Sequence, residues 1–110
     1  MEIGPWQAQL RKGAAELVVL ACLREGELYG VRILQRTNRA GDIVTEGALY
    51  PLLSRLEKEG KLASRWVTDD GPHPRKYYRL TDNGERLLAA MTDGWVRFRT
   101  AMSDVVEEGR

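Results

Sequence analysis

The sequence predicts a mainly α-helical fold with a small β-hairpin: a winged helix-turn-helix followed by a long C-terminal dimerisation helix. Three observations predict it. Apolar residues recur at helical spacing as far as Gly60, alternate along two short segments after it, and then recur at heptad spacing almost to the end of the chain. The last change of period places a boundary near residue 80, between a domain of residues 1–80 and a dimerisation helix of residues 81–110.

The composition is that of an ordinary globular domain. The chain has 110 residues, 43% hydrophobic and 30% charged, with a net charge of +1, so any contact with nucleic acid must come from a local basic patch. Cys22 is the only cysteine, which excludes an internal disulfide, and its apolar surroundings favour a buried thiol. The apolar run around Cys22 is much shorter than a membrane span, and Met1 is followed by no apolar signal segment. We expect a cytoplasmic protein with no membrane contact.

The first helix is expected from about Gly13 to Arg24. Its second half is almost entirely apolar, and a helix that is hydrophobic on most sides is buried on most sides. In so small a domain this pattern hints at a second subunit. The stretch from Ile3 to Leu10 precedes this predicted helix, and Trp6 within it needs a packing partner on the chain itself or on another protein.

A second, short helix is expected to open at Leu28 and to run to about Asn38, because Val31 and Leu34 lie at helical spacing. The segment of residues 40–42, Ala-Gly-Asp, then breaks the pattern. Three helices with tight connections, of which the helix after Thr45 is the third, are the arrangement of a helix-turn-helix domain.

The third helix begins at Thr45, whose side chain can cap it, and stops at Gly60, which suits the left-handed conformation of a helix end. Its apolar stripe consists of Leu49, Leu52, Leu53 and Leu56. The opposite face is small, neutral and aromatic over its first two turns, which indicates contact with something large. Pro51 within this helix allows two interpretations: a tolerated kink, or a helix start splayed towards a ligand.

A β-hairpin follows Gly60. Residues 62–68 and 76–80 are rich in aromatic and β-branched residues, as strands are, and residues 69–75 between them are dense in turn-forming residues. Two strands alone are marginally stable, so we expect this hairpin to pack against the helices as a wing.

The final helix is expected to start after Thr81, its cap, and carries a heptad seam of apolar residues to nearly the end of the chain. A seam of this length favours a homodimer, although folding back on the same subunit remains the alternative. The expected dimer interface comprises Trp6, Leu10, Leu17, Leu88, Met91, Trp95, Phe98, Met102 and Val105.

Several motifs resemble the PadR-like transcriptional regulators, over about residues 17–95. They are Leu28-Tyr29-Gly30, the segment Gly-Ala-Leu-Tyr-Pro-Leu-Leu-Ser-Arg-Leu-Glu-Lys-Glu-Gly of residues 47–60, the segment Pro-Arg-Lys-Tyr-Tyr-Arg-Leu-Thr of residues 74–81, and Trp95. The resemblance implies a winged helix-turn-helix homodimer that binds an inverted-repeat operator in double-stranded DNA, usually as a repressor. It also implies a compact branch in which paired tryptophans sandwich flat aromatic compounds.

The chain departs from the family pattern at three positions. Ala48 stands where the family usually has threonine, and His73 stands where it has an arginine of the wing, so both changes remove a potential contact with DNA. Arg99 stands where some cation-binding relatives carry an acid, which argues against a cationic ligand.

Local charge supports a DNA-binding role for residues 1–80, because basic residues cluster on the third helix and the hairpin while the last helix is net acidic. A winged-helix module that binds protein instead of DNA remains the alternative, and salt dependence separates the two. The expected DNA-binding residues are Gly47, Ala48, Tyr50, Ser54, Arg55, His73, Arg75 and Lys76.

The expectation for a small-molecule effector is a planar, neutral or anionic aromatic compound held by Trp95, Arg99 and Met91 between two long helices. Plain dimer core at Trp95 explains the same pattern equally well. No catalytic constellation, metal-ligand set or cofactor motif occurs: the single histidine lies between two prolines in a turn, and the single cysteine lies in an apolar helix. No glycine-rich phosphate loop appears, and the carboxylates are scattered along the chain. We expect neither enzymatic activity nor a metal or cofactor.

Overall fold

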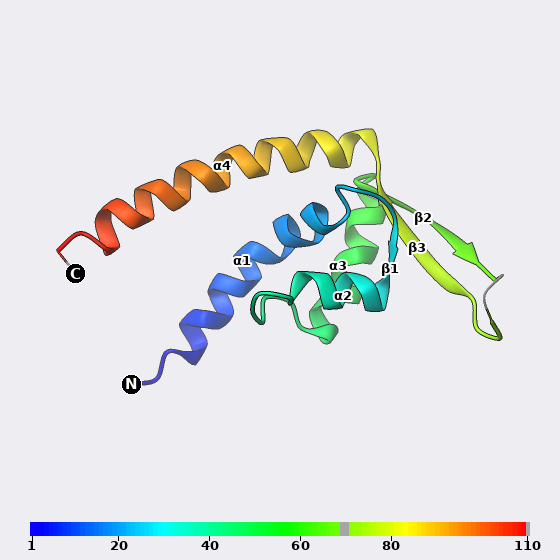
Figure 1. The fold of residues 1–110 in the computed structure, drawn as a ribbon, viewed down its shortest axis with the longest axis horizontal. Coiled ribbons are helices and arrows are strands. Elements are labelled where there is room, and N and C mark those ends of the chain that lie inside the picture. The colour runs from blue at the N-terminus through cyan, green and yellow to red at the C-terminus, as the bar shows by residue number, and fades with distance from the viewer. Residues whose placement is uncertain (69–70, 110) are drawn as a thin grey trace.

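The computed structural model describes residues 1–68 and 71–109. Helices pack around a three-stranded antiparallel sheet (Figure 1). In chain order the elements are α1 (Gly4–Cys22), β1 (Leu28–Tyr29), α2 (Gly30–Thr37), α3 (Glu46–Lys58), β2 (Leu62–Val67), β3 (Arg75–Leu80) and α4 (Asp82–Val106). The predicted fold class, a winged helix-turn-helix with a long C-terminal helix, is confirmed.

Helix α1 is longer than the sequence pattern predicted. It begins at Gly4 rather than near Gly13, with a proline in its first turn, and ends at Cys22. Proline is favoured there because its fixed φ suits a helix and its missing N–H would have no helical partner. Trp6 and Leu10 therefore lie on α1 itself and not in a preceding segment, and both are exposed.

The prediction that Leu28 opens the second helix is wrong, because Leu28 and Tyr29 form a short strand. Leu28 pairs with Tyr78 and Tyr29 pairs with Tyr77, so β1 lies at one edge of the sheet, in the order β1-β3-β2. Helix α2 begins only at Gly30, directly after this strand. A two-residue strand carries no periodicity, and this is why the sequence pattern could not reveal it.

Helix α3 matches the expectation closely. The Thr45 side chain accepts a hydrogen bond from the Ala48 N–H at 3.2 Å, which caps the first turn. Pro51 is accommodated inside the helix. Gly60 follows the last turn with φ +76, the left-handed conformation that glycine adopts without steric cost.

Strands β2 and β3 form the predicted hairpin, with a register that runs from Leu62 opposite Leu80 to Val67 opposite Arg75. It projects well beyond α2 and α3 as a wing (Figure 1). Asp69 and Asp70, at the start of the predicted turn, lie outside the described residues.

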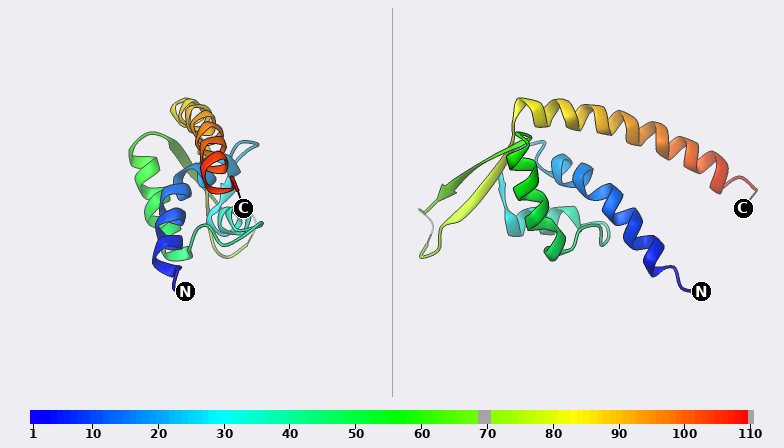
Figure 2. Two further views of the ribbon diagram at one scale, coloured as in Figure 1. Left: turned by 90° about the vertical axis from the view of Figure 1, so that its left-hand side faces the viewer. Right: turned by 180° about the vertical axis from the view of Figure 1, so that it is seen from behind.

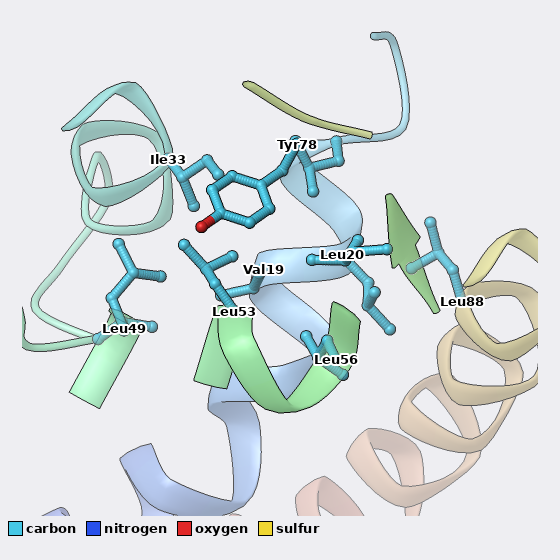
Figure 3. Close-up of a cluster of buried hydrophobic side chains, with 11 residues drawn as sticks. Val19, Leu20, Ile33, Leu49, Leu53, Leu56, Tyr78 and Leu88 are labelled. Atoms are coloured by element: carbon cyan, nitrogen blue, oxygen red, sulfur yellow. The ribbon is translucent and has the colours of Figure 1, made fainter. Parts of the chain in front are cut away.

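One apolar core joins α1, α2, α3, the sheet and the start of α4 (Figure 3). The ring of Tyr78 points between Ile33, Val19 and Leu53. Leu88 of α4 belongs to this core with 4% of its surface exposed. Leu88, which the sequence suggested for the dimer interface, therefore already has its side chain buried within its own subunit.

Helix α4 begins as predicted, with the Thr81 hydroxyl accepting from the Gly84 N–H at 3.1 Å and donating to the Gly60 carbonyl at 2.6 Å. Its first turns pack on the core. Its C-terminal half then runs apart from the first turns of α1, which diverge from it (Figures 1 and 2). That half exposes a series of large apolar side chains, namely Trp95, Val96, Phe98, Met102, Val105 and Val106.

Candidate nucleic-acid interface

The outward face of α3 is small and uncharged near its N-terminus. Gly47, Ala48 and Ser54 are exposed, and Tyr50 keeps 42% of its surface accessible. No side chain lies within 4 Å of where a Cβ would stand at Gly47. A large partner can therefore approach the backbone of this helix closely.

Tyr50 does not project freely into solvent, because its ring lies against the backbone of Gly30 at the start of α2. A Cβ added at Gly30 would come within 2.7 Å of the Tyr50 ring and of its hydroxyl oxygen. The two helices of the helix-turn-helix thus meet through a contact that a Cβ at position 30 would displace. In the sequence, Gly30 stands out only as part of the Leu28-Tyr29-Gly30 motif, and its spacing does not predict this contact.

Arg55, which the sequence suggested as a phosphate contact, is held by two carboxylates. Its Nη2 lies 2.7 Å from Glu16 of α1 and its Nη1 lies 3.1 Å from Glu59. These hydrogen bonds, with Glu16 the larger cause and Glu59 the next, raise the pKa of Arg55 above its usual value. A phosphate would have to share this guanidinium with two acids.

Arg75 and His73 lie at the outer end of the wing and are both exposed. The Arg75 guanidinium lies over the ring of Tyr29, 4.7 Å from the ring centroid, and Tyr29 in turn packs edge-on against Tyr77. No carboxylate within residues 1–68 and 71–109 pairs with Arg75. Its charge is therefore oriented by an aromatic ring and remains available to an anion.

Lys76 joins the wing to α3. Its ammonium lies 3.2 Å from Glu57, and the Ser64 hydroxyl donates a hydrogen bond to the same carboxylate. The Ser64 hydrogen bond first, and Lys76 next, lower the pKa of Glu57, while Glu57 raises the pKa of Lys76. The sequence analysis missed Glu57, since nothing in its spacing showed that α3 would lie against the hairpin.

A second ion pair supports the other face of the sheet. Arg65 of β2 binds Glu27, which precedes β1, and lies 5.9 Å from the ring centroid of Tyr77. The hydrogen bond from Arg65 lowers the pKa of Glu27. This ion pair links β2 to the residue before β1, and it lies on the face of the sheet that points away from α3.

The expected effector and dimer residues are distributed over α1 and α4. Trp95 is 46% exposed and Arg99 is exposed, whereas Met91 is half-buried against the subunit's own core. Leu17 also packs partly on that core. The remaining expected interface residues are all exposed: Trp6, Leu10, Phe98, Met102 and Val105.

A groove of about 500 Å³ lies between α1 and α3. Its floor includes Ala15, Ala48 and Leu52, and Arg11, Lys12 and Arg55 stand around it. The groove runs beside the outward face of α3 and does not include the residues expected to hold an effector.

Neither a membrane-spanning helix nor a cluster of metal ligands is found in the described part of the chain. No helix there combines the length and hydropathy needed to cross a bilayer. No three histidine, cysteine or acidic side chains there come together in a way that could hold a metal ion.

Comparison with known proteins places this geometry in context. The family model of the "Transcriptional regulator PadR-like family" matches residues 19–90. A transcriptional regulator of Mycobacterium tuberculosis is 33% identical over 100 residues, which are 91% of this chain and 86% of that protein. The crystal structure of a PadR-like transcriptional regulator from Bacillus cereus superposes with a TM-score of 0.81 at 30% identity, covering 93% of this chain and 99% of that chain.

A further similar structure contains DNA. It is the crystal structure of Bacillus subtilis PadR in complex with operator DNA, with a TM-score of 0.63 and 27% identity. The match covers 71% of this chain and 46% of that chain.

Proposed function

The chain belongs to the PadR-like family of transcriptional regulators, and from this premise we propose that it is a repressor that binds an inverted-repeat operator in double-stranded DNA as a homodimer. Residues 1–80 would bind DNA and residues 81–110 would supply the dimer contact, with Leu88 anchoring the second segment to the core of the first. Such a protein acts in the cytoplasm and without enzymatic activity.

One observation carries the DNA-binding proposal: the small, uncharged face of α3 lies next to a wing whose Arg75 has no carboxylate partner in the described residues. A helix that enters the major groove needs a face that lets its backbone approach the bases, and a wing needs cations for the phosphates. That a similar structure, the Bacillus subtilis protein, is a complex with operator DNA supports DNA binding by this fold.

The roles of the individual side chains follow from their surroundings. We propose that Tyr50 and Ser54 reach base edges, with Gly47 and Ala48 allowing the approach. Arg75 would bind a phosphate, with His73 as a weaker contact at the wing tip. Arg55 and Lys76 hold carboxylates in the free protein, so we assign them a smaller share of phosphate binding.

The dimer proposal rests on exposed apolar surface. Phe98, Met102 and Val105 of α4 are exposed, as are Trp6 and Leu10 of α1. Exposed apolar side chains that recur along one helix, as Phe98, Met102 and Val105 do on α4, favour an interface with another chain. Two α3 helices related by a dimer axis would enter successive major grooves, about 34 Å apart on one face of the duplex.

The test of DNA binding uses a duplex selected by the protein from a random-sequence library, followed by anisotropy titrations at several salt concentrations. We expect an inverted repeat and an affinity that falls steeply with salt, by a log–log slope of about −0.9 for each phosphate contact. Arg75→Ala should weaken binding to all sequences and flatten that slope. Arg97→Ala, on the exposed surface of α4, is the matched control and should leave both unchanged.

Failure of the selection to enrich any sequence, together with binding of a protein partner that is insensitive to salt, would favour a protein-interaction module instead. Sedimentation tests the dimer separately. We expect a dimer at micromolar concentration and dissociation on Phe98→Asp. A folded wild-type monomer would contradict the proposal.

We further propose that a planar aromatic compound, neutral or anionic, enters between the two α4 helices at Trp95 and releases the DNA. Arg99 would favour an anion and Met91 would line the inner side. Titration with planar aromatics should quench the tryptophan emission of wild type. In Trp95→Phe the remaining emission, from Trp6 and Trp66, should not be quenched. If no such compound changes Trp95 emission or DNA affinity, Trp95 is plain dimer core.

A further inference from the structure

We propose that Trp66 contacts DNA. Its indole would pack against the sugar–phosphate backbone of the DNA strand that passes between α3 and the wing. The proposal rests on the DNA-binding function proposed above and adds a contact of a different chemical kind. From the sequence, Trp66 is expected in the hairpin, and no role follows from its position there.

The strand register determines which way Trp66 faces. Trp66 lies opposite Lys76, Ser64 lies opposite Tyr78, and Leu62 lies opposite Leu80. Alternate residues of a strand share a face, so Trp66 lies on the face that buries Leu62 and Tyr78 against the helices. The outer part of the hairpin projects beyond α3 (Figure 1), and Trp66 is the large apolar side chain on this face near the outer end of the ladder.

Contacts with α3 confirm that this face turns towards the recognition helix. Lys76, the cross-strand neighbour of Trp66, reaches Glu57 of α3 at 3.2 Å, and Ser64 bonds the same carboxylate. Glu57 follows Ser54 by three residues, so the two are neighbours on the helix surface, and Ser54 lies on the outward face of α3. Trp66 therefore stands at the corner between the recognition helix and the wing.

The exposure of Trp66 is high for such a side chain. It keeps 64% of its surface accessible, and the Lys76 ammonium lies 5.9 Å from its ring centroid. A buried tryptophan stabilises a core, but Trp66 contributes little to this one. An indole can instead cover a deoxyribose with its ring and donate its N–H to a phosphate oxygen.

Duplex DNA is the occupant that the neighbouring charges favour. Arg75 adjoins Lys76 on β3 but lies on the opposite face of the hairpin, where it carries a cation without a carboxylate partner in the described residues. A polyanion that Arg75 binds at this end of the narrow two-stranded wing would lie beside Trp66 as well. The same surface is continuous, through Ser64 and Glu57, with the face of α3 assigned to the major groove.

The local charge gives the contact a distinctive signature. Glu57 compensates the charge of Lys76, so Trp66 sits beside a neutral pair rather than a free cation. A contact made by ring packing and one neutral hydrogen bond displaces no condensed counterions. Its loss should weaken binding without changing the salt slope, unlike the loss of Arg75.

The test compares Trp66→Ala and Trp66→Phe with wild type on the library-selected duplex. We expect Trp66→Ala to bind about tenfold more weakly with an unchanged log–log salt slope. Trp66→Phe should recover part of the affinity through ring packing. Val67→Ala, one residue along β2 on the opposite face, is the control and should bind within about twofold of wild type. Circular dichroism checks that each variant is folded.

Fluorescence supplies a second readout. The chain has three tryptophans, so DNA should change the emission of wild type by an amount that disappears in Trp66→Phe. Wild type that binds DNA while both Trp66 variants match its affinity and its emission change would overturn this proposal and leave the DNA-binding function intact. Wild type that binds no duplex would overturn the DNA-binding function itself.

Discussion

Gly30 lies directly against the ring of Tyr50, so closely that a Cβ at Gly30 would stand 2.7 Å from the Tyr50 hydroxyl oxygen and from one ring carbon. The first residue of α2 thereby orients an aromatic side chain on the outward face of α3. The two helices that define the motif are joined at the point where we place a contact with DNA.

Gly30→Ala should displace Tyr50 and weaken DNA binding about tenfold, because a misplaced side chain loses its contact with a base edge. Stability should fall only modestly, since Tyr50 is exposed enough to rotate away. Gly41→Ala, where the added methyl meets nothing within 4 Å, is the control. A double-mutant cycle with Tyr50→Ala should show no further loss from Gly30→Ala; independent effects of the two substitutions would contradict this coupling.

Gly84→Ala should destabilise the fold. A Cβ at Gly84 would overlap the Lys61 carbonyl oxygen, which is backbone and already accepts from the Thr81 N–H at 3.2 Å. Relieving the overlap must shift the start of α4, at a cost of about 1–3 kcal/mol in the free energy of unfolding. Gly94→Ala, in the same helix with open space around it, should stabilise by about 0.5–1 kcal/mol. Equal effects of the two substitutions in denaturant titrations would exclude this explanation.

Much of the fold could be predicted from the sequence because its signals are local. The cap at Thr45, the stop at Gly60, the cap at Thr81 and the change of hydrophobic period all act within a few residues. The errors have equally physical causes. The strand at Leu28 is too short to show a period. The early start of α1 depends on a proline in its first turn, which a search for periodic apolar residues does not detect.

The candidate site could be predicted by residue type but not by partner. The basic residues of α3 and the wing were identified, yet nothing in the spacing showed that Glu16 would hold Arg55 or that Glu57 would hold Lys76. The close approach of Gly30 to Tyr50 depends on how α2 crosses α3, which only the tertiary structure shows. The heptad spacing of α4 likewise does not show that Leu88 packs into the core of its own subunit.

Glu57→Gln should loosen the wing in a way that depends on pH. The pKa of Glu57 lies below its ordinary value of 4.5, chiefly because Ser64 donates to it. The ionised carboxylate therefore contributes stability above that ordinary value, and the contribution is lost as the pH falls through the lowered pKa. Wild type should melt above Glu57→Gln at pH 7, and the gap should narrow progressively as the pH falls below 4.5. A gap of constant size would show that Glu57 acts through something other than its charge.

Cys22 should react slowly with alkylating reagents at neutral pH. Burial raises the pKa of its thiol to about 11, outweighing the lowering effect of Arg36, and the thiol donates to the Val19 carbonyl at 3.0 Å. The thiolate is the reactive form, so the rate of alkylation should increase with pH until the pH exceeds the pKa of Cys22. Unfolding, which exposes the thiol, should also increase this rate sharply. Rapid modification of the folded protein by iodoacetamide at pH 7 would contradict this environment.

The central claim is that α3 and the wing together bind DNA, and hydrogen exchange with and without the library-selected duplex tests it most directly. We expect slower exchange of backbone amides in residues 46–54 of α3 and in the wing strands, and little change in the exposed C-terminal half of α4. Protection confined to α4, with α3 and the wing unaffected, would contradict the account.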